Sequence, residues 1–120
     1  MVNPTLHDVR TWNRGCYVAI HVYRLLNAVP DRPFAERVIT NAFKIPEGIA
    51  TALNSHLHGP RDGALEASLE ALVVLQTQLY WATECGLVDN PGVADVSHAA
   101  AALVEDLLAE RDRRGHRLAS

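Results

Sequence analysis

Apolar residues recur at helical spacing in four blocks of this 120-residue sequence, and no block alternates with the period of two that is typical of a strand. Pro30, the dipeptide Gly59-Pro60 and the turn-forming segment LVDNPG separate the blocks. We therefore predict helices at about residues 6–28, 33–57, 62–85 and 92–112, with a frayed polar tail after them. Because short turns join them, the predicted fold is an all-α, antiparallel up-down four-helix bundle, and residues 1–120 form a single domain.

One apolar stripe in each predicted helix is expected to face the core of the bundle. Gln76 is a polar residue in the middle of its stripe, and we expect it to form a hydrogen bond across the bundle. The four stripes are Val9, Trp12, Cys16, Ala19, Tyr23 and Leu26; Phe34, Val38, Ala42, Ile45, Ile49 and Leu53; Leu65, Leu69, Leu72, Gln76, Leu79 and Thr83; and Val93, Val96, Ala100, Leu103 and Leu107.

The second predicted helix contains Pro46 and Gly48 in the middle of its apolar stripe. A proline inside a helix costs about 3 kcal/mol, because it removes a backbone hydrogen bond and its ring crowds a carbonyl group. Glycine costs about 1 kcal/mol more than alanine there. Because Ile45, Ile49 and Leu53 continue the stripe across the break, the sequence favours one helix that is kinked at Pro46. Two short helices are the alternative.

Three segments of the chain resemble a bacterial family of small four-helix-bundle proteins: DVRTWNRGCYVAIHVYRLLNAVP, KIPEGIA and LQTQLYWATECGLVD. The family includes proteins encoded in intervening sequences of 23S rRNA genes and the accessory (Avd-like) proteins of diversity-generating retroelements. Its first-helix motif, Asp-Leu-x-x-Trp, is matched by Asp8, Val9 and Trp12. Residues 45–52 and 74–79 match the motifs Ile-Pro-x-Asn-Ile-Ala-Glu-Gly and Glu-Leu-Glu-Thr-Gln-Leu of the next two helices. The similarity extends over about residues 6–110.

The sequence departs from the family at shared polar positions, which are here Gly48, Thr51, Ala52, Val74 and Gln76. The resemblance implies a small bundle protein that assembles into ring-like homopentamers. It also raises the possibility of a role with nucleic acid, as in the retroelement members.

Apolar side chains outside the predicted core stripes are candidates for an oligomer interface, because a helix that is apolar on two sides needs a second covering surface. One group forms a ridge on the first helix, and the other lies opposite the core stripe of the third helix. For Trp81, a fold back along its own bundle is the alternative. The candidate interface residues are Val18, Val22, Leu25, Val29, Val74 and Trp81.

A stripe of Arg10, Arg14, Tyr17, His21 and Arg24 runs along the outer side of the first predicted helix. Such a stripe could follow a phosphate backbone, or it could be an ordinary solvated face. Residues 1–60 carry six basic and four acidic side chains, and residues 61–120 carry five and ten. Because the net charge of the chain is −3, nucleic acid is the less favoured partner.

No motif of catalysis or cofactor binding is recognisable, so we predict neither an enzymatic reaction nor a cofactor. Asp95-x-x-His98 and His56-x-His58 lack the further ligands that a metal site needs, and no metal site is predicted. Cys16 and Cys85 are expected to be small buried hydrophobes. We find neither a signal sequence nor a membrane-spanning segment, and we expect a cytoplasmic protein.

Two functional hypotheses follow from these features. The first is a non-enzymatic, homo-oligomeric bundle, with the ring-like pentamer that the resemblance implies, which acts as a scaffold or as an adaptor for another protein. The alternative is a nucleic-acid-binding accessory protein that acts with RNA, DNA or a reverse transcriptase.

Overall fold

Capping residues define the starts of the first two helices in the computed structural model, which describes residues 5–55 and 58–119. Helix α1 (Leu6–Leu26) follows a capping box, in which Thr5 Oγ1 accepts from the Asp8 N–H and the Asp8 carboxylate accepts from the Thr5 N–H, both at 3.0 Å. Helix α2 (Arg32–Asn54) follows Asp31, whose carboxylate accepts from the Phe34 N–H at 3.2 Å.

The other two helices are longer than predicted. Helix α3 (His58–Glu84) is followed by a Schellman motif, in which Gly86 has a positive φ of 71° and hydrogen bonds run from Gly86 N to Thr83 O and from Leu87 N to Ala82 O. Helix α4 (Asn90–Ala119) continues seven residues beyond the predicted end at residue 112. No proline interrupts residues 113–119, and five of the seven (three Arg, one Leu and one Ala) are strong helix formers, so the helix continues despite Gly115.

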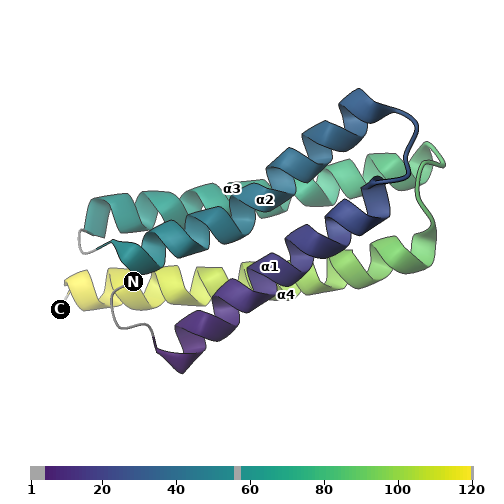
Figure 1. Ribbon diagram of the computed structural model, residues 1–120. Helices are drawn as coiled ribbons and strands as arrows, with labels where there is room; N and C mark the ends of the chain where they lie inside the picture. The colour runs from purple at the N-terminus through teal and green to yellow at the C-terminus, as the bar shows by residue number, and fades with distance from the viewer. Residues whose placement is uncertain (1–4, 56–57, 120) are drawn as a thin grey trace.

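The all-α prediction is confirmed: across 5–55 and 58–119 the chain forms four helices and no strand. Helix α1 packs against α2 and α4, and α3 also packs against α2 and α4, so that each helix has two neighbours (Figure 1). The molecule is elongated, with extents of 49 × 22 × 21 Å. Residues 56 and 57, which the sequence placed at the end of the second helix, lie outside the described residues.

The core follows the predicted stripes of α2 and α4 closely. In α4, Val96, Ala100, Leu103 and Leu107 are buried and Val93 is half-buried. The predicted stripe of α2 is buried from Val38 to Ile49 and half-buried at both ends. In α3, the predicted leucines are joined by Ser68, Ala71, Leu75, Gln78 and Ala82.

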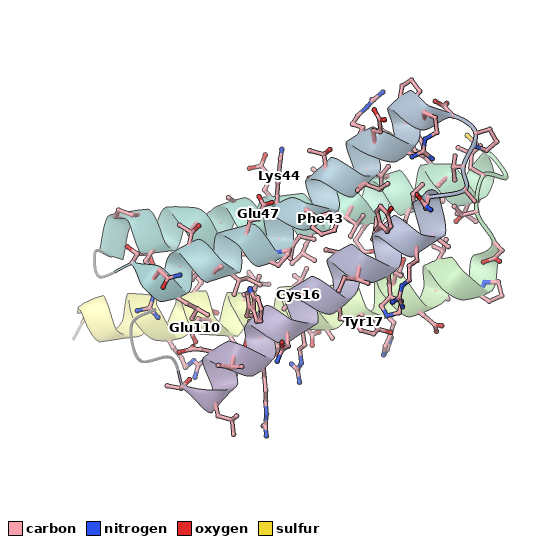
Figure 2. All side chains as sticks on the ribbon, viewed as in Figure 1. Cys16, Tyr17, Phe43, Lys44, Glu47 and Glu110 are labelled. Atoms are coloured by element: carbon pink, nitrogen blue, oxygen red, sulfur yellow. The ribbon has the colours of Figure 1, made fainter. Side chains whose placement is uncertain are left out.

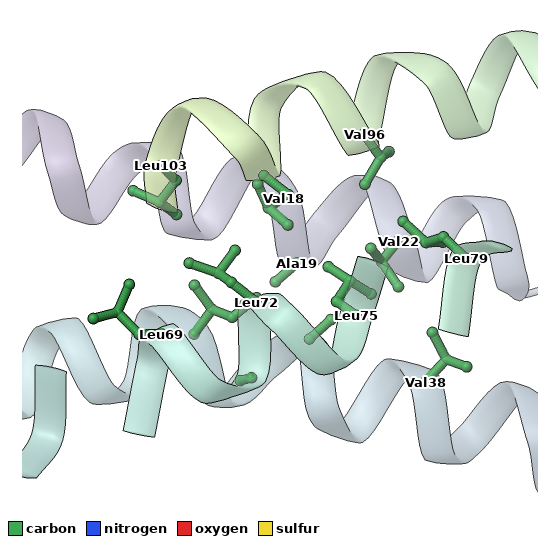
Figure 3. Close-up of a cluster of buried hydrophobic side chains, with 14 of the residues drawn as sticks. Val18, Ala19, Val22, Val38, Leu69, Leu72, Leu75, Leu79, Val96 and Leu103 are labelled. Carbon is green, nitrogen blue, oxygen red and sulfur yellow. The ribbon is translucent and has the colours of Figure 1, made fainter. Parts of the chain in front are cut away.

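The predicted core stripe of α1 is wrong in part: Ala19 and Leu26 are buried as predicted and Cys16 is half-buried, but Val9, Trp12 and Tyr23 are exposed. Trp12 is 38% exposed and Tyr23 is 46% exposed, whereas Val18 and Val22 are fully buried beside leucines of α3 and α4 (Figure 3). Both sides of this helix carry apolar residues at helical spacing, so periodicity could not choose between them. The small size of Gly15 decides which side of α1 is buried against α2. A Cβ atom on Gly15 would lie only 3.0 Å from Ile49 Cδ1 and 3.4 Å from Pro46 Cα, so a larger residue would not fit there.

Pro46 lies inside α2, which is one continuous helix, so the alternative of two separate helices is wrong. The ring of Pro46 is buried against Gly15 of α1, and Ile45 and Ile49 on either side of it are also buried. On the neighbouring side of α2, the hydroxyl of Ser68 donates to the carbonyl of Ile45 at 2.9 Å. Packing against two helices therefore holds the segment that contains the proline.

Gly48 lies where α2 and α3 approach each other closely. A Cβ atom at this position would overlap Ser68 Oγ and would lie 2.8 Å from the carbonyl oxygen of Ala64. Glycine is therefore required here by the contact with α3 and not by an unusual backbone conformation. This contact explains why the chain keeps a weak helix former only two residues from the proline.

Polar side chains inside the bundle connect α3 to both of its neighbours. The side-chain amide of Asn41 on α2 donates to Ala71 O at 2.9 Å and to Gln78 Oε1 at 3.2 Å, and Gln78 is buried. Gln76 Nε2 donates to Ser97 O of α4 at 3.2 Å, which confirms the predicted hydrogen bond across the bundle. These pairings satisfy polar groups that burial would otherwise leave without partners.

Two glycine-to-alanine substitutions should change stability in opposite directions. We expect Gly48→Ala to lower the free energy of unfolding by about 1–2 kcal/mol, because overpacking against Ser68 and Ala64 exceeds the gain in helix propensity. Gly63→Ala in α3, where a Cβ would meet no atom within 4 Å, should raise it by about 0.5–1 kcal/mol. Urea denaturation monitored by circular dichroism measures both values, and a stabilising Gly48→Ala would contradict the close α2–α3 contact.

Candidate interaction surfaces

Large apolar side chains remain exposed on two separate parts of the bundle, each over more than a third of its surface. The first group, here called the α1–α2 surface, is formed by Val9, Trp12, Ile20, Tyr23 and Phe43. The second group, here called the α3 surface, is formed by Val73, Val74, Tyr80 and Trp81. Apolar clusters of this kind on a small protein are typical of protein–protein contacts.

The α1–α2 surface is partly hollow. Val9 and Trp12 of α1 and Ala50 and Leu53 of α2 line a cavity of about 160 Å³. Phe43 and Cys16 lie on the same face of the molecule, the one turned to the viewer in Figure 2. An apolar side chain of a partner is the chemistry that such a hollow would accept.

Four of the predicted interface residues belong to the core or its edge, so this part of the prediction is wrong. Val18 and Val22 have no exposed surface, Val29 is 3% exposed and Leu25 is half-buried against the core. They were predicted to lie outside the core because the other apolar side of α1 was predicted to be buried. Because the opposite side of α1 is buried, Trp12, Ile20 and Tyr23 are exposed, and none of the three was among the predicted interface residues.

The two predicted interface residues on α3 are accessible. Val74 is 41% exposed and Trp81 is 52% exposed, so the indole of Trp81 is not covered by its own bundle. Val73 and Tyr80, which directly precede Val74 and Trp81 in the sequence, are also exposed and are likewise seven residues apart. That repeat is the sequence signal that would have found them.

The basic stripe of α1 lies beside acidic residues of α4. Arg14 forms an ion pair with Asp106, and the rings of Tyr17 and His21 have centroids 4.0 Å apart. Figure 2 shows Tyr17 on the side of α1 that is turned toward α4. An exposed ion pair of this kind contributes at most about 1 kcal/mol, but it occupies one of the three arginines.

A groove of about 410 Å³ continues from this stripe along the contact of α1 with α4. Tyr17, His21 and Arg24 line one side of it, and Asp89 and Asp95 contribute carboxylates. A phosphate backbone that followed the stripe would therefore approach these carboxylates as well as the arginines. The local charge, like the net charge, disfavours nucleic acid as the partner.

Within the part of the chain that the structure describes, no group of three or more His, Cys, Asp or Glu side chains could hold a metal ion. Asp95 and His98 are both exposed on α4. His56 and the side chain of His58 lie outside the described residues. Among the described residues, none of the helices combines the length and hydrophobicity that crossing a membrane requires.

No protein-family model matches this chain, and a comparison with curated proteins finds no match. The positions where the chain departs from the resembled family have local roles in this structure. Gly48 allows the contact with α3, Ala52 is buried, and the Thr51 hydroxyl donates to Glu47 O within α2. Gln76 bonds to α4 and Val74 is exposed.

The two cysteines are placed differently from the prediction that both are buried. Cys16 is half-buried within the apolar side of α1, and burial raises the pKa of its thiol. Cys85 is exposed just after the end of α3, immediately before the turn at Gly86.

We expect Cys85 to react faster than Cys16 with a thiol reagent at pH 8 and low protein concentration. Cys16 is less accessible, and its raised pKa lowers the thiolate fraction at any pH below that pKa, so its rate should rise as the pH increases. With an aromatic disulfide as the reagent, each reaction releases a coloured thiolate, and its absorbance over time shows a fast phase for Cys85 and a slow phase for Cys16. Cys85→Ser should remove the fast phase and Cys16→Ser the slow one; equal rates would contradict the burial of Cys16.

Proposed function

We propose that this chain is a non-enzymatic cytoplasmic bundle that works by self-association, as a homo-oligomeric scaffold or as an adaptor for another protein. We place it in the family of 23S rRNA intervening-sequence and retroelement accessory proteins that its motifs resemble. The resemblance makes a ring of five chains the expected assembly. The observation that carries the proposal is the exposure of large apolar side chains on two surfaces of one small bundle.

The proposed architecture is an antiparallel up-down bundle in which α2 bends at Pro46. The arrangement in which α1 and α3 each contact α2 and α4, together with short connections, supports this topology. The missing N–H of Pro46 supports a bend, because the carbonyl of Ala42 loses its helical partner. In this arrangement the α1–α2 surface and the α3 surface belong to different sides of the molecule.

Self-association should be visible as a particle of several chains. At micromolar concentration, light scattering coupled to size-exclusion chromatography should give a multiple of the chain mass of 13.2 kDa. Val74→Glu with Trp81→Glu should reduce the mass to that of one chain, because charged side chains would replace the apolar contact on α3.

Ala101→Glu with Ala102→Glu is the matched control, since both residues are exposed on α4, away from the two apolar surfaces. The control should keep the mass of the wild type. A wild-type protein that is monomeric at micromolar concentration would contradict the proposal.

The alternative function is an accessory role with RNA, DNA or a reverse transcriptase. It is favoured by Arg10 and Arg24, which are exposed and form no ion pair within the described residues. If it is right, single-stranded RNA or DNA should bind at about 50 mM salt and dissociate as salt rises. Arg10→Ala with Arg24→Ala should weaken this binding in a fluorescence anisotropy titration, with Arg37→Ala as the control. An absence of binding at about 50 mM salt would end this alternative.

A further inference from the structure

A single stripe along the outer side of α3 combines apolar and acidic residues in a fixed order. Glu70, Val74, Thr77, Trp81 and Glu84 follow one another at steps of four and three residues, which places them on one face of the helix. All five are exposed. Within the described residues Glu70 and Glu84 form no ion pair, whereas Glu66 of the same helix is paired with Arg111 of α4 at 3.0 Å.

The exposed side of α1 has the complementary order of charges. Arg10 follows Val9 at one end of the apolar stripe, and Arg24 is one turn from Ile20 at the other end. Both arginines lie along the edge of that stripe nearer α4, where Arg24 also borders the groove with Asp89 and Asp95. Arg10 and Arg24 are 14 residues apart, as are Glu70 and Glu84, so each pair spans about 21 Å along its helix. The two stripes therefore match in length, and each has apolar side chains between two like charges, which are basic on α1 and acidic on α3.

The net charges of the two parts of the chain also favour a contact between the α1–α2 surface and the α3 surface. Residues 5–55, which form α1 and α2, carry six basic and four acidic side chains, a balance of +2. Residues 58–84, which form α3, carry Arg61 against Asp62, Glu66, Glu70 and Glu84, a balance of −3. Two copies of α3 would repel one another, and so would two copies of the α1–α2 surface, whereas one of each attracts.

We propose that the α3 stripe of one copy of this protein docks on the α1–α2 surface of a second copy, with the two helices antiparallel. This pairing rests on the self-association proposed above and assigns which surface contacts which. Glu84 then faces Arg10, Glu70 faces Arg24, and Val74 faces Ile20. Trp81 comes to lie beside Val9 and Trp12, where the cavity of about 160 Å³ can receive its indole ring.

Antiparallel docking of α3 on α1 is favoured over parallel docking, because only the antiparallel direction places the apolar residues of one stripe beside those of the other. In the parallel direction the same charge pairing would place Trp81 opposite His21 and Val74 opposite Arg14, which already pairs with Asp106. Because the contact joins two different surfaces, it is heterologous, and each copy keeps one free surface of each kind. Repetition of such a contact produces a closed ring or an open filament and not a two-fold dimer.

Charge reversal on one surface at a time tests this pairing. Arg10→Glu with Arg24→Glu makes the α1–α2 surface acidic like α3, and Glu70→Lys with Glu84→Lys makes α3 basic. Each double variant alone should lose assembly and give the mass of one chain, 13.2 kDa, by light scattering. An equimolar mixture of the two should assemble again, because every contact between unlike variants joins an acidic surface to a basic one. Since the two variants must alternate, the mixture should form particles with even numbers of chains or open chains, and not the closed ring of five expected for the wild type.

Arg37→Glu with Lys44→Glu is the control, as it reverses two charges on α2, where Lys44 is turned away from α1 (Figure 2). It should keep the wild-type mass, and circular dichroism should show equal helix content in all variants. A wild-type monomer would overturn the self-association itself. A wild-type oligomer would leave self-association standing but overturn the pairing if either double variant alone keeps its mass, or if the mixture stays monomeric.

Discussion

The close packing of α1 and α3 around Pro46 is the constraint on which the rest of the structure depends. The proline removes a hydrogen bond from the interior of α2, and neighbouring helices must hold the segment in place. Gly15 of α1 permits contact with the proline ring, and Gly48 permits contact with Ser68, whose hydroxyl binds the Ile45 carbonyl. Gly15 and Gly48, two weak helix formers near the proline, are thus positions where neighbouring helices come close.

This packing also determines which side of α1 remains in solvent. Because the side with Gly15 and Ala19 must face α2, the side with Trp12, Ile20 and Tyr23 is left exposed. On α3, contacts with α2 and α4 occupy two sides and leave Trp81 outside. Both candidate interaction surfaces are therefore consequences of how the core is assembled, and their opposite charges give them a reason to meet.

Much of the fold could be predicted from helical spacing, since the stripes of α2 and α4 and the left-handed cap at Gly86 follow local rules. The buried side of α1 could not, because Val18 and Val22 have the same periodicity as Val9 and Tyr23. The choice depends on the size of Gly15 against Pro46, a contact between residues 31 positions apart. Val74 and Trp81 could be predicted as interface residues because their side of α3 lies opposite its core stripe. Phe43 could not, because it joins an exposed apolar surface only when α1 and α2 pack side by side.

Native-state hydrogen exchange of α2 tests most directly whether this packing unites the two halves of the helix. If contacts with α1 and α3 hold the segment around Pro46, the amides of Val38 and Ala42 before it and of Ile49 and Ala52 after it should exchange with the same free energy, that of global unfolding. Exchange of Ile49 and Ala52 at a much lower free energy than Val38 and Ala42 would show two independent segments and would contradict the account.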